Sequence, residues 1–385
     1  SDVYKRQHLC LNGPYNEGWN YQENILPKYH VKQGHRVYQI VTPYMWKENE
    51  LAVSHDKRYV NEDGVEVIRC KAKKGLIGGI RFNRYPEVFG LLDEIHPDIL
   101  FIHDVQCLDI MVVVKYLKKH GKCTVYVDNH SDFSNSARNW LSKNVLHKIV
   151  WRTMAKKIEP YVKKFYGVLP ARVDFLIDVY NLPKEKCELL VMGADDDLVK
   201  KNEKPEIRKK IRKQYNISEQ DFLVMTGGKI DAFKTQTFLL MEAINEIKNQ
   251  NVKLIVFGSV DENLKSKVNQ LVDGEKVQYI GWVDANESYA LFAAADLVVF
   301  PGRHSVFWEQ VVGQGIPMVV KYWRGTTHVD VCENVKFLYN DSKEEIKETI
   351  SEIMQDDVYD KMKKNAINAS KQFRYSDIAK RSIET

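Results

Sequence analysis

The segment DLVVFPGRHSVFWEQVVGQGIPMVV, residues Asp296–Val320, decides the fold of this chain. Two apolar runs, Leu297–Phe300 and Pro317–Val320, flank a stretch that opens with Pro-Gly and contains Glu309. Short apolar runs bounded by Pro and Gly, with a helix between them, predict a βαβ unit of a parallel sheet covered on both faces. Because ligands of such sheets bind beyond the carboxyl ends of the strands, Gly302–Glu309 is the candidate site, where helix N–H groups favour an anion.

Length and composition predict two folded domains without a nucleic-acid partner. A chain of 385 residues exceeds one ordinary core, and 44% hydrophobic with 28% charged residues is far from a disordered composition. The net charge of +5 is mild. The basic run Lys204–Tyr215 predicts a solvated helix face, because no aromatic platform accompanies it, although it leaves open a peripheral contact with anionic lipid.

Cysteine spacing and hydropathy favour a cytoplasmic protein. The six cysteines show no C-x-x-C or His/Cys pattern, which predicts reduced core residues and neither disulfides nor a zinc site. No apolar run approaches the roughly eighteen residues of a membrane span, and no signal peptide is visible. Residues 1–7, SDVYKRQ, resemble a translated library adapter, so we exclude them as an expected artefact and begin the first strand within His8–Asn12.

The first half of the chain begins with a strand, a glycine-containing loop, a helix and a second strand. The helix is expected at Gln22–Lys32 and the strand at Arg36–Val41. This order is typical of a doubly wound α/β fold, but G-x-G-x-x-G spacing is missing, so a dinucleotide fingerprint is not supported. Further elements are expected at Val65–Cys70 (strand), Lys73–Pro86 (loop), Arg81–Ile95 (helix), Leu108–His120 (helix) and Asn135–Lys164 (helix).

Polar side chains follow two buried strands, Pro97–Asp104 and Cys123–Phe133. They are His103, Asp128, His130 and Asp132. Carboxyl ends of parallel strands share one sheet edge, so these groups are expected together, either as a functional cluster or as satisfied structural residues. A metal site is less favoured, since no His pair with i,i+4 spacing accompanies them.

The second half repeats the strand, loop and helix order in Phe222–Ile247, followed by a strand in Val252–Ser259 and a helix in Asn286–Ala294. Lys229 and Lys234 lie in the first loop, beside a Gly-Gly pair. Two fixed ammonium groups and close backbone approach suit a diphosphate, whereas a plain turn with two solvated lysines is the alternative.

These blocks resemble the retaining glycosyltransferases of family 4, also called glycosyl transferases group 1. The resemblance rests on the opening segment, on GGKIDAFK (227–234) and on VMGADDD (191–197). It implies an α/β protein of the GT-B fold, with two doubly wound, Rossmann-like domains facing a cleft. The domains would comprise 8–195 on the acceptor side and 196–370 on the donor side, and 371–385 would be a helix that crosses back.

The resemblance also implies the residues of the active site. Catalytic roles would fall to His130, Lys229, Lys234 and Glu309. Donor binding would involve Gly13, Gly228, Gly258, Trp282, Val283, His304, Ser305, Val306, Phe307 and Gln310. The acceptor side would present Trp19, Tyr21, His103 and Asp128. The expected activity is hexosyl transfer from a nucleotide-diphosphate sugar to a sugar or lipid-linked acceptor, without metal or other cofactor.

The sequence departs from the family pattern in the opening segment. The family has two glutamates eight residues apart, whereas Glu309 is the only carboxylate of this helix. Glu309 would contact the ribose, with Gln310 as a rival, and His304 would replace the first glutamate. Lys229 occupies the usual place of an arginine. Thr326–His328 would supply phosphate contacts or form a plain β-turn.

Two rival functions and one rival motif remain open. A UDP-sugar epimerase of the same fold would need paired carboxylates, for which Asp128 and Glu309 are the candidates. A non-catalytic nucleotide-sugar-binding subunit would tolerate the missing glutamate. Asp195–Asp197 offers a D-x-D pattern, but an interdomain turn is the favoured interpretation.

Overall fold

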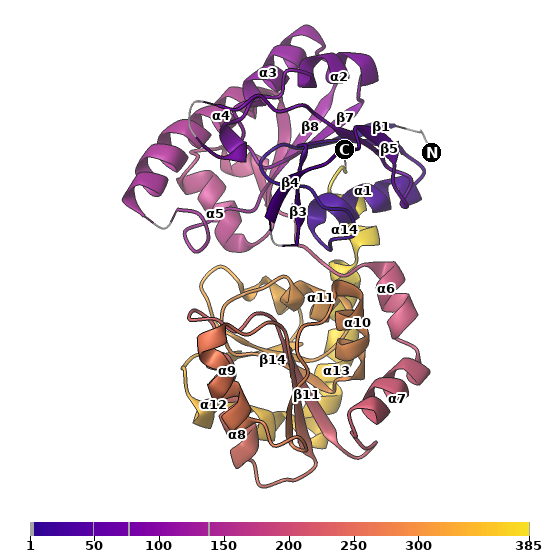
Figure 1. Cartoon of the computed structure of the whole chain (residues 1–385), viewed down its shortest axis with the longest axis vertical. Helices are drawn as coiled ribbons and strands as arrows, with labels where there is room; N and C mark the ends of the chain where they lie inside the picture. Colours follow the sequence, from indigo (N-terminus) through magenta and orange to yellow (C-terminus); the bar gives the residue numbers. More distant parts are fainter. Residues whose placement is uncertain (1–3, 49, 76–77, 138, 385) are drawn as a thin grey trace. The chain divides into compact units, whose positions relative to one another are not determined.

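The computed structural model describes residues 4–48, 50–75, 78–137 and 139–384. The chain forms two units (Figure 1), which we call unit 1 (Ser1–Val191 with Ile378–Thr385) and unit 2 (Met192–Asp377). We had expected divisions after residues 195 and 370, and they fall after residues 191 and 377. Residues 1–3 of the expected artefact, 76–77 of the expected loop and 138 of an expected helix lie outside the described residues.

Unit 1 is built on an eight-stranded sheet of order β10-β9-β8-β7-β1-β2-β6-β5. Its strands are β1 (Lys5–Cys10), β2 (Arg36–Val41), β5 (Arg58–Val60), β6 (Glu66–Arg69), β7 (Ile99–His103), β8 (Thr124–Asn129), β9 (Val162–Gly167) and β10 (Cys187–Leu189). All neighbours are parallel except β5, which runs antiparallel to β6. A separate antiparallel hairpin joins β3 (Tyr44–Lys47) to β4 (Glu50–Val53).

The helices of unit 1 cover both faces of this sheet. They are α1 (Gln22–Lys32), α2 (Val88–Ile95), α3 (Ile110–Lys119), a π-helical stretch (Ser142–Trp151), α4 (Arg152–Ile158) and α5 (Pro170–Asp178). Successive strand residues point to opposite faces, so Ile40 joins the large core with α2 to α5 while Val41 joins a smaller core beside α1. This alternation explains why the central strands are apolar throughout.

Unit 2 contains a fully parallel six-stranded sheet of order β13-β12-β11-β14-β15-β16. Its strands are β11 (Phe222–Gly227), β12 (Val252–Phe257), β13 (Val277–Tyr279), β14 (Leu297–Phe300), β15 (Met318–Lys321) and β16 (Val335–Leu338). Its helices are α6 (Asp196–Asn202), α7 (Pro205–Gln214), α8 (Gln236–Glu246), α9 (Lys265–Leu271), α10 (Ala285–Ala294), α11 (Phe307–Gly313), α12 (Lys343–Ile353) and α13 (Asp356–Ser370). The segment quoted first forms β14, α11 and β15, so the predicted βαβ unit is confirmed. Helix α14 (Tyr375–Arg381) carries the chain back into unit 1.

Chain order reverses once in each sheet. In unit 2 the first strand, β11, lies between β12 and β14, and in unit 1 β1 lies between β2 and β7. Helices therefore leave these neighbouring strands toward opposite faces, which opens space at their carboxyl ends. The expected doubly wound α/β architecture is confirmed, and these two switch points define where a ligand site is expected in each unit.

Proline explains two wrong helix predictions. The helix expected at Arg81–Ile95 begins only at Val88, because Pro86 disfavours helical geometry in the residue before it. The helix expected to reach Lys164 ends at Ile158, just before Pro160, and the next residues form β9. Antiparallel strands β3 to β5 were not predicted.

Two charged segments of unit 2 also differ from expectation. Asp195 caps α6 by accepting a hydrogen bond from the backbone N–H of Asp197 at 2.9 Å, so this triplet starts a helix. Helix α7, expected to be solvated, buries Arg212, and Arg208 and Arg212 lie 2.6 and 3.2 Å from the Asp296 carboxylate. These ion pairs connect α7 to Asp296, the residue directly before β14.

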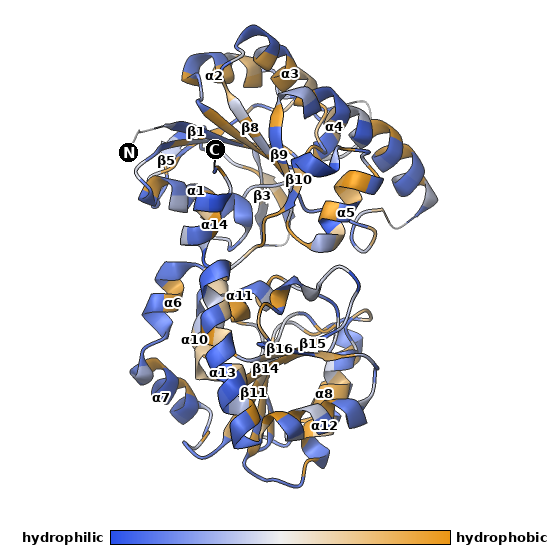
Figure 2. Cartoon of the chain, turned by 180° about the vertical axis from the view of Figure 1, so that it is seen from behind, coloured by the Kyte–Doolittle hydropathy of each residue, from blue (hydrophilic) through white to orange (hydrophobic). Residues whose placement is uncertain are grey.

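Hydropathy follows this layering. Figure 2 shows apolar colouring concentrated on the strands and polar colouring on the outer sides of the helices. Among the residues that the structure describes, no helix combines the length and apolar character needed to cross a bilayer.

Lys5–Gln7, which we had excluded with the first seven residues, forms half of β1. Gln7 lies between Tyr38 of β2 and Leu100 of β7 and is fully buried. Within the described residues neither polar atom of its side-chain amide has a hydrogen-bond partner. An unpartnered buried amide costs roughly 1–3 kcal/mol, so this position destabilises unit 1.

We therefore expect Gln7→Leu to raise the stability of the chain by about 1–3 kcal/mol, since the variant removes an unpaired amide at similar volume. Thermal and urea unfolding measure this change. The matched control is Gln39→Leu in the adjacent strand, because the Gln39 amide accepts from Tyr15 at 3.1 Å and donates to the Glu23 carbonyl at 2.6 Å. That variant should be less stable than the parent, and a loss of stability in both variants would contradict the prediction.

Candidate functional site

The end of β8 in unit 1 holds a buried carboxylate between two histidines. Oδ2 of Asp128 lies 2.8 Å from Nδ1 of His103 and 3.3 Å from Nε2 of His130. Oδ1 accepts from the backbone N–H of Asp104 at 3.1 Å. The Asp128 side chain is fully buried and that of His130 is 30% exposed, so His130 is the member that can meet a ligand.

Charge pairing sets the protonation states of this cluster. Burial alone would raise the pKa of Asp128, but His103 and His130 outweigh it and lower the pKa well below the usual carboxyl range. Burial alone would lower the pKa of His130, but the Asp128 carboxylate outweighs it and raises that pKa above 6.5. The cluster therefore favours an ionised Asp128 facing a protonated His130.

Two further histidines extend this cluster into the core. Nε2 of His103 lies 3.0 Å from Nδ1 of His8, and Nε2 of His8 lies 3.0 Å from Nδ1 of His30. Nε2 of His30 then meets the carbonyl of Ala379 and the hydroxyl of Ser382, each at 3.1 Å. His8 and His30 were not predicted as part of this cluster, because a single histidine in a strand or helix carries no spacing signal.

The remaining acceptor-side residues of unit 1 lie in the loop before α1. Trp19 and Tyr21 are exposed and meet edge to face, with ring centroids 5.4 Å apart. The Gly13 carbonyl accepts from the Thr42 hydroxyl at 2.8 Å, which ties this loop to the end of β2. Exposed aromatic faces suit a sugar ring. His103 and Asp128, by contrast, are buried behind His130 and do not face solvent.

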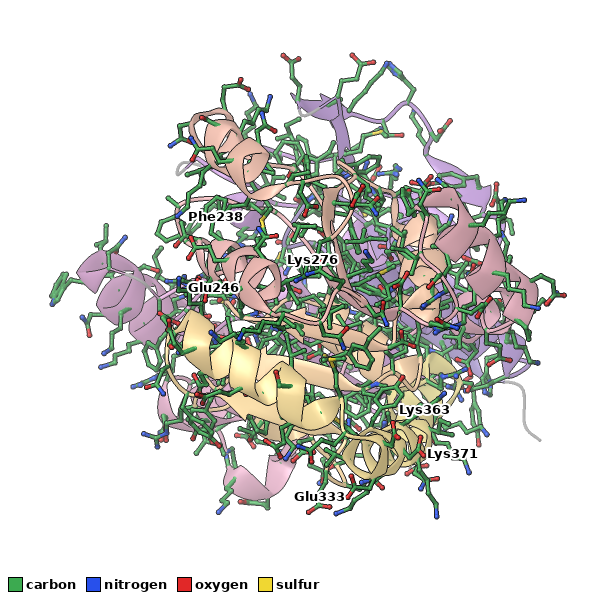
Figure 3. All side chains as sticks on the ribbon, turned by 90° about the horizontal axis from the view of Figure 1, so that it is seen from below. Phe238, Glu246, Lys276, Glu333, Lys363 and Lys371 are labelled. Carbon is green, nitrogen blue, oxygen red and sulfur yellow. The ribbon has the colours of Figure 1, made fainter. Side chains whose placement is uncertain are left out.

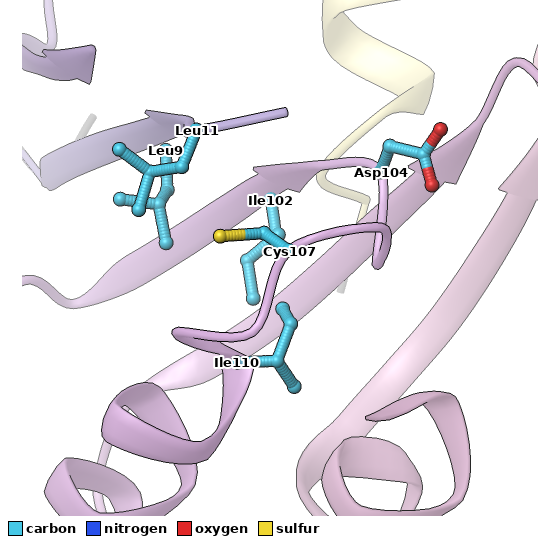
Figure 4. Close-up of a pocket in the computed structure, with 6 residues that line it drawn as sticks. All are labelled: Leu9, Leu11, Ile102, Asp104, Cys107 and Ile110. Atoms are coloured by element: carbon cyan, nitrogen blue, oxygen red, sulfur yellow. The ribbon is translucent and has the colours of Figure 1, made fainter. Parts of the chain in front are cut away.

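A small pocket at the β1 and β7 ends is not a binding site. It is lined by Leu9, Leu11, Ile102, Asp104, Cys107 and Ile110. Figure 4 shows the Asp104 carboxylate pointing away from the apolar side chains. With an almost wholly apolar lining deep in the core, the pocket offers no polar group to orient a ligand.

Three cations gather at the switch point of unit 2. Exposed Lys229 pairs with Asp261, with Nζ 2.9 Å from Oδ1. Lys234 is half-buried, and burial lowers its pKa; Asp231 opposes this, while Arg303 and Lys229 lower it further. Arg303, which the sequence analysis missed, lies in the loop before α11, with its guanidinium 5.3 Å from the Phe233 ring centroid. Like charges this close favour an anionic ligand.

Glycines bring two loops of this edge into backbone contact. Gly228 and Gly258 both have φ of +125°, a conformation that side-chain-bearing residues rarely adopt. A Cβ on Gly258 would lie 2.1 Å from the Gly228 carbonyl oxygen, so only glycine permits this packing. Beyond them Trp282 is exposed and Val283 half-buried, which leaves the Trp282 ring available to a base.

Glu309 of α11 is a second buried carboxylate, and it lies between two histidines from other segments of unit 2. Oε1 of Glu309 lies 2.7 Å from Nε2 of His304 and 2.8 Å from Nε2 of His328. Burial would raise the pKa of Glu309, but the two histidines outweigh it and lower the pKa to about 2. Within the described residues Oε2 of Glu309 and Nδ1 of His328 have no hydrogen-bond partner. These unused polar atoms can receive ligand hydroxyls.

The other predicted donor-binding residues surround α11. Phe307 packs against Phe257 and Phe292, with ring centroids 5.8 and 5.4 Å apart. Gln310, the rival for the ribose, points into the core and donates to Ser288 Oγ at 3.0 Å. Val306 is exposed, and the Ser305 hydroxyl has no partner within the described residues. The predicted contacts of these residues with a donor stay predictions.

In the part of the chain that the structure describes, three clusters bring imidazole nitrogens and carboxylate oxygens within 4.8 Å of one another. They are His103 with Asp128 and His130, His304 with Glu309 and His328, and Asp93 with His96 and His120. In the two buried clusters the nitrogens facing the carboxylate lie within 2.7–3.3 Å of it. At these distances the histidines and the carboxylate of each cluster form a paired network.

Comparison with known proteins identifies the family. Residues 207–373, which form most of unit 2, match the family model described as Glycosyl transferases group 1. This part of the chain, somewhat less than half of it, is thus similar to the glycosyl transferases group 1 family. The family resemblance drawn from the sequence is thus confirmed.

Two curated relatives match parts of this chain. An uncharacterized glycosyltransferase of Methanocaldococcus jannaschii is 23% identical over 147 residues, which cover 37% of this chain and 38% of the relative. An uncharacterized 41.2 kDa protein in the cps region of Klebsiella pneumoniae is 23% identical over 208 residues, covering 53% and 54%. The chain thus spans about two fifths and about half of the length of these relatives.

Solved structures support the GT-B fold across the whole chain. A glycosyltransferase from Rickettsia africae matches with a TM-score of 0.70 and 13% identity, covering 99% of this chain and 97% of that one. Anabaena HepE in complex with UDP and glucose matches with a TM-score of 0.65 and 16% identity, covering 98% of each chain. At such identities the likeness establishes the fold alone.

The pairing of Glu309 predicts a pH dependence of stability. Its pKa is about 2 in the folded protein against 4.5 as the ordinary value. A carboxyl group whose pKa is lower in the folded than in the unfolded state stabilises the folded protein at pH values above its unfolded pKa. For Glu309 this stabilisation is lost as the pH falls from about 4.5 toward 2. It amounts to the order of 3 kcal/mol.

We expect Glu309→Gln to lose less stability than the parent between about pH 5 and pH 3, because a neutral amide cannot titrate. Urea unfolding across this range measures the difference. Glu333→Gln is the matched control, since Glu333 lies on the outside of unit 2 (Figure 3) and pairs with Lys361 at its exposed surface. Parallel pH profiles for the parent and Glu309→Gln would contradict the assignment.

Proposed function

We propose that this group 1 protein is a retaining glycosyltransferase that transfers a hexose from a UDP-sugar to an acceptor hydroxyl without a metal ion. The observation that carries the proposal is the group of Lys229, Lys234 and Arg303 at the switch point of unit 2. A nucleoside diphosphate leaving group develops negative charge on its phosphates, and fixed cations can stabilise that charge where no divalent ion is bound.

The comparisons support the donor and the pathway. The Anabaena structure of the same fold is described as a complex with UDP and glucose, and another with UDP-glucose. The Klebsiella relative is described as lying in a cps region. On this basis we propose a UDP-linked donor, a sugar or lipid-linked acceptor and a role in cell-surface polysaccharide synthesis at the cytoplasmic side of the membrane.

The proposed reaction needs no protein nucleophile. The bond between the anomeric carbon and the diphosphate oxygen breaks while the acceptor oxygen bonds to the same face of that carbon. The acceptor proton passes to the departing diphosphate oxygen, so atoms and charge balance. Lys229, Lys234 and Arg303 act on the transition state, because the phosphate charge they face grows as the bond breaks.

Side chains around α11 would hold the sugar and ribose. Glu309 is ionised, and its Oε2 has no partner among the described residues, so it can accept a hydrogen bond from a hydroxyl of the nucleotide sugar. His304, which pairs with Glu309, lies in the loop where the family has its first glutamate. His328 supports Glu309 from the other side. We assign the ribose contact to Glu309 and not to Gln310, whose amide is engaged with Ser288.

In unit 1, His130 is proposed to contact the transferred sugar and the acceptor, and Trp19 with Tyr21 to stack against the acceptor. His130 is partly exposed and charge-paired with Asp128, so it offers a firmly oriented donor of hydrogen bonds. The burial of Asp128 and Glu309, each held by two histidines, speaks against the epimerase alternative, which needs carboxylates free for proton transfer.

Lys229→Ala and Lys234→Ala are each expected to lower kcat by roughly a hundredfold or more with intact folding, because each removes a cation from the leaving group. Release of UDP from a panel of UDP-sugars, with and without acceptor, measures turnover. Lys265→Ala is the control, since Lys265 is an exposed lysine of the same unit paired with Glu262. Near-normal rates in both loop variants would remove the assignment, and UDP-sugar binding without turnover in the parent would instead indicate a non-catalytic subunit.

The same fixed cations predict activity without divalent metal. Turnover should be unchanged within about twofold after treatment with EDTA, since the ammonium and guanidinium groups supply the charge that a metal ion would otherwise supply. The measurement compares initial rates before treatment, after treatment and after addition of Mg²⁺ or Mn²⁺. Loss of activity in EDTA with recovery on adding metal would contradict the mechanism.

A further inference from the structure

Unit 1 contains a row of hydrogen-bonded side chains that runs from the turn after its last helix to Asp128, whose carboxylate lies 3.3 Å from Nε2 of His130. The row runs through Ser382, His30, His8, His103 and Asp128. The three internal imidazoles come from α1, β1 and β7, and adjacent rings stack with centroids 5.1 and 5.2 Å apart. All five side chains are buried, so no solvent competes for their hydrogen bonds.

We propose that His8, His30 and His103 are positioning residues for His130, held in a single head-to-tail set of tautomers that the Asp128 carboxylate imposes. The row would thereby fix the side chain that orients His130. The hydrogen-bonded row stands independently of the enzymatic activity, whereas its consequence for catalysis rests on the proposed function of His130.

The direction of every hydrogen bond in the row follows from Asp128. A carboxylate only accepts, so Nδ1 of His103 carries its proton. In the proposed arrangement His103 carries no second proton, so its Nε2 accepts from Nδ1–H of His8. His8 in turn accepts at Nε2 from Nδ1–H of His30. All three rings are therefore Nδ1–H tautomers, and burial, which lowers the pKa of His8 and of His30 well below 6.5, keeps those two neutral.

The far end of the row favours the opposite direction. Nε2 of His30 lies 3.1 Å from the Ala379 carbonyl, which can only accept, and from the Ser382 hydroxyl, which also donates to that carbonyl at 2.8 Å. An Nε2–H on His30 would satisfy Ala379. With a neutral His103 the carboxylate at the other end opposes this arrangement, whereas a His103 protonated at both ring nitrogens would satisfy both ends of the row. The tautomers of His8 and His30 therefore report which form of His103 faces Asp128, and Nε2–H on both rings in the parent would overturn the proposal.

Charged groups outside the row also affect the protonation of its histidines and of His130. Arg6, on the same strand, acts on His8 and His30 and disfavours their protonation, and His35 acts likewise on His30. Glu23 favours a protonated His130, and Arg172 opposes it. None of these groups is changed by the variants below.

Nitrogen-15 NMR of histidine-labelled full-length protein tests the proposal, because the shifts of the two ring nitrogens reveal the tautomer. We expect Nδ1–H signals for His8, His30 and His103, and we expect those of His8 and His30 not to change between about pH 5 and pH 9. In Asp128→Asn the side-chain amide can donate to Nδ1 of His103, which then no longer needs to carry a proton. His103, His8 and His30 should therefore all switch to the Nε2–H tautomer. The matched control is Asp93→Asn, whose carboxylate lies 2.7 Å from Nε2 of His120 in the same unit, and it should alter only signals of His120 and its neighbours.

Ser382→Ala provides a second test should Asp128→Asn fail to fold. It removes the hydroxyl that can donate to His30, and we expect His30 to remain an Nδ1–H tautomer because Asp128 sets the direction. A switch of His30 to Nε2–H in this variant, unchanged tautomers in folded Asp128→Asn, or titration of His8 or His30 near neutral pH in the parent would each overturn the proposal.

A pair of substitutions at His103 tests the catalytic consequence. His103→Asn retains a donor near the place of Nδ1, whereas His103→Gln places its amide near Nε2 and loses the contact with Asp128. We expect kcat to fall roughly tenfold further in His103→Gln than in His103→Asn, with donor KM unchanged within about twofold. Equal losses in both variants would overturn the positioning role. A parent without transfer activity but with the predicted tautomers would instead refute the proposed function and leave the row intact.

Discussion

Each unit of this protein depends on keeping one ionised carboxylate in its interior. A buried charge is tolerated only when it is paired and hydrogen-bonded, because burial removes the water that would otherwise stabilise it. Asp128 meets this condition through His103 and His130, and Glu309 through His304 and His328. In both places the histidines come from loops or strand ends beside the switch point, so one electrostatic requirement fixes several segments at the edge where ligands bind.

The two carboxylates differ in what they leave unused. Both oxygens of Asp128 are engaged, and its network continues inward through His103 to His8 and His30. Its effect on a ligand can therefore pass only through His130. Glu309 has an oxygen without a partner among the described residues, so it can bind a hydroxyl directly. Unit 1 thus positions a histidine, and unit 2 presents a carboxylate.

Local sequence patterns predicted what depends on local physics. Periodicity and glycine signals placed α1 and β2 at the observed bounds and identified the βαβ unit around Glu309. The two helices predicted too long each span a proline, Pro86 or Pro160, and the observed helices avoid it. His8 and His30 could not be recognised, because they meet His103 only when separate elements pack. Arg303 was missed for the same reason, since its relation to Lys234 is tertiary.

The contrast between locked carboxylates and free cations explains how such a site can exchange ligands. An exposed ion pair such as Lys229 with Asp261 contributes only about 0–1 kcal/mol, because water competes with both partners. The diphosphate of the proposed donor would therefore take over that lysine at little cost and also relieve the repulsion among Lys229, Lys234 and Arg303. A buried pair such as Glu309 with His328 would cost far more to separate. The buried carboxylate and its histidines are thus the fixed part of this edge, while the exposed lysine can change partners at little cost.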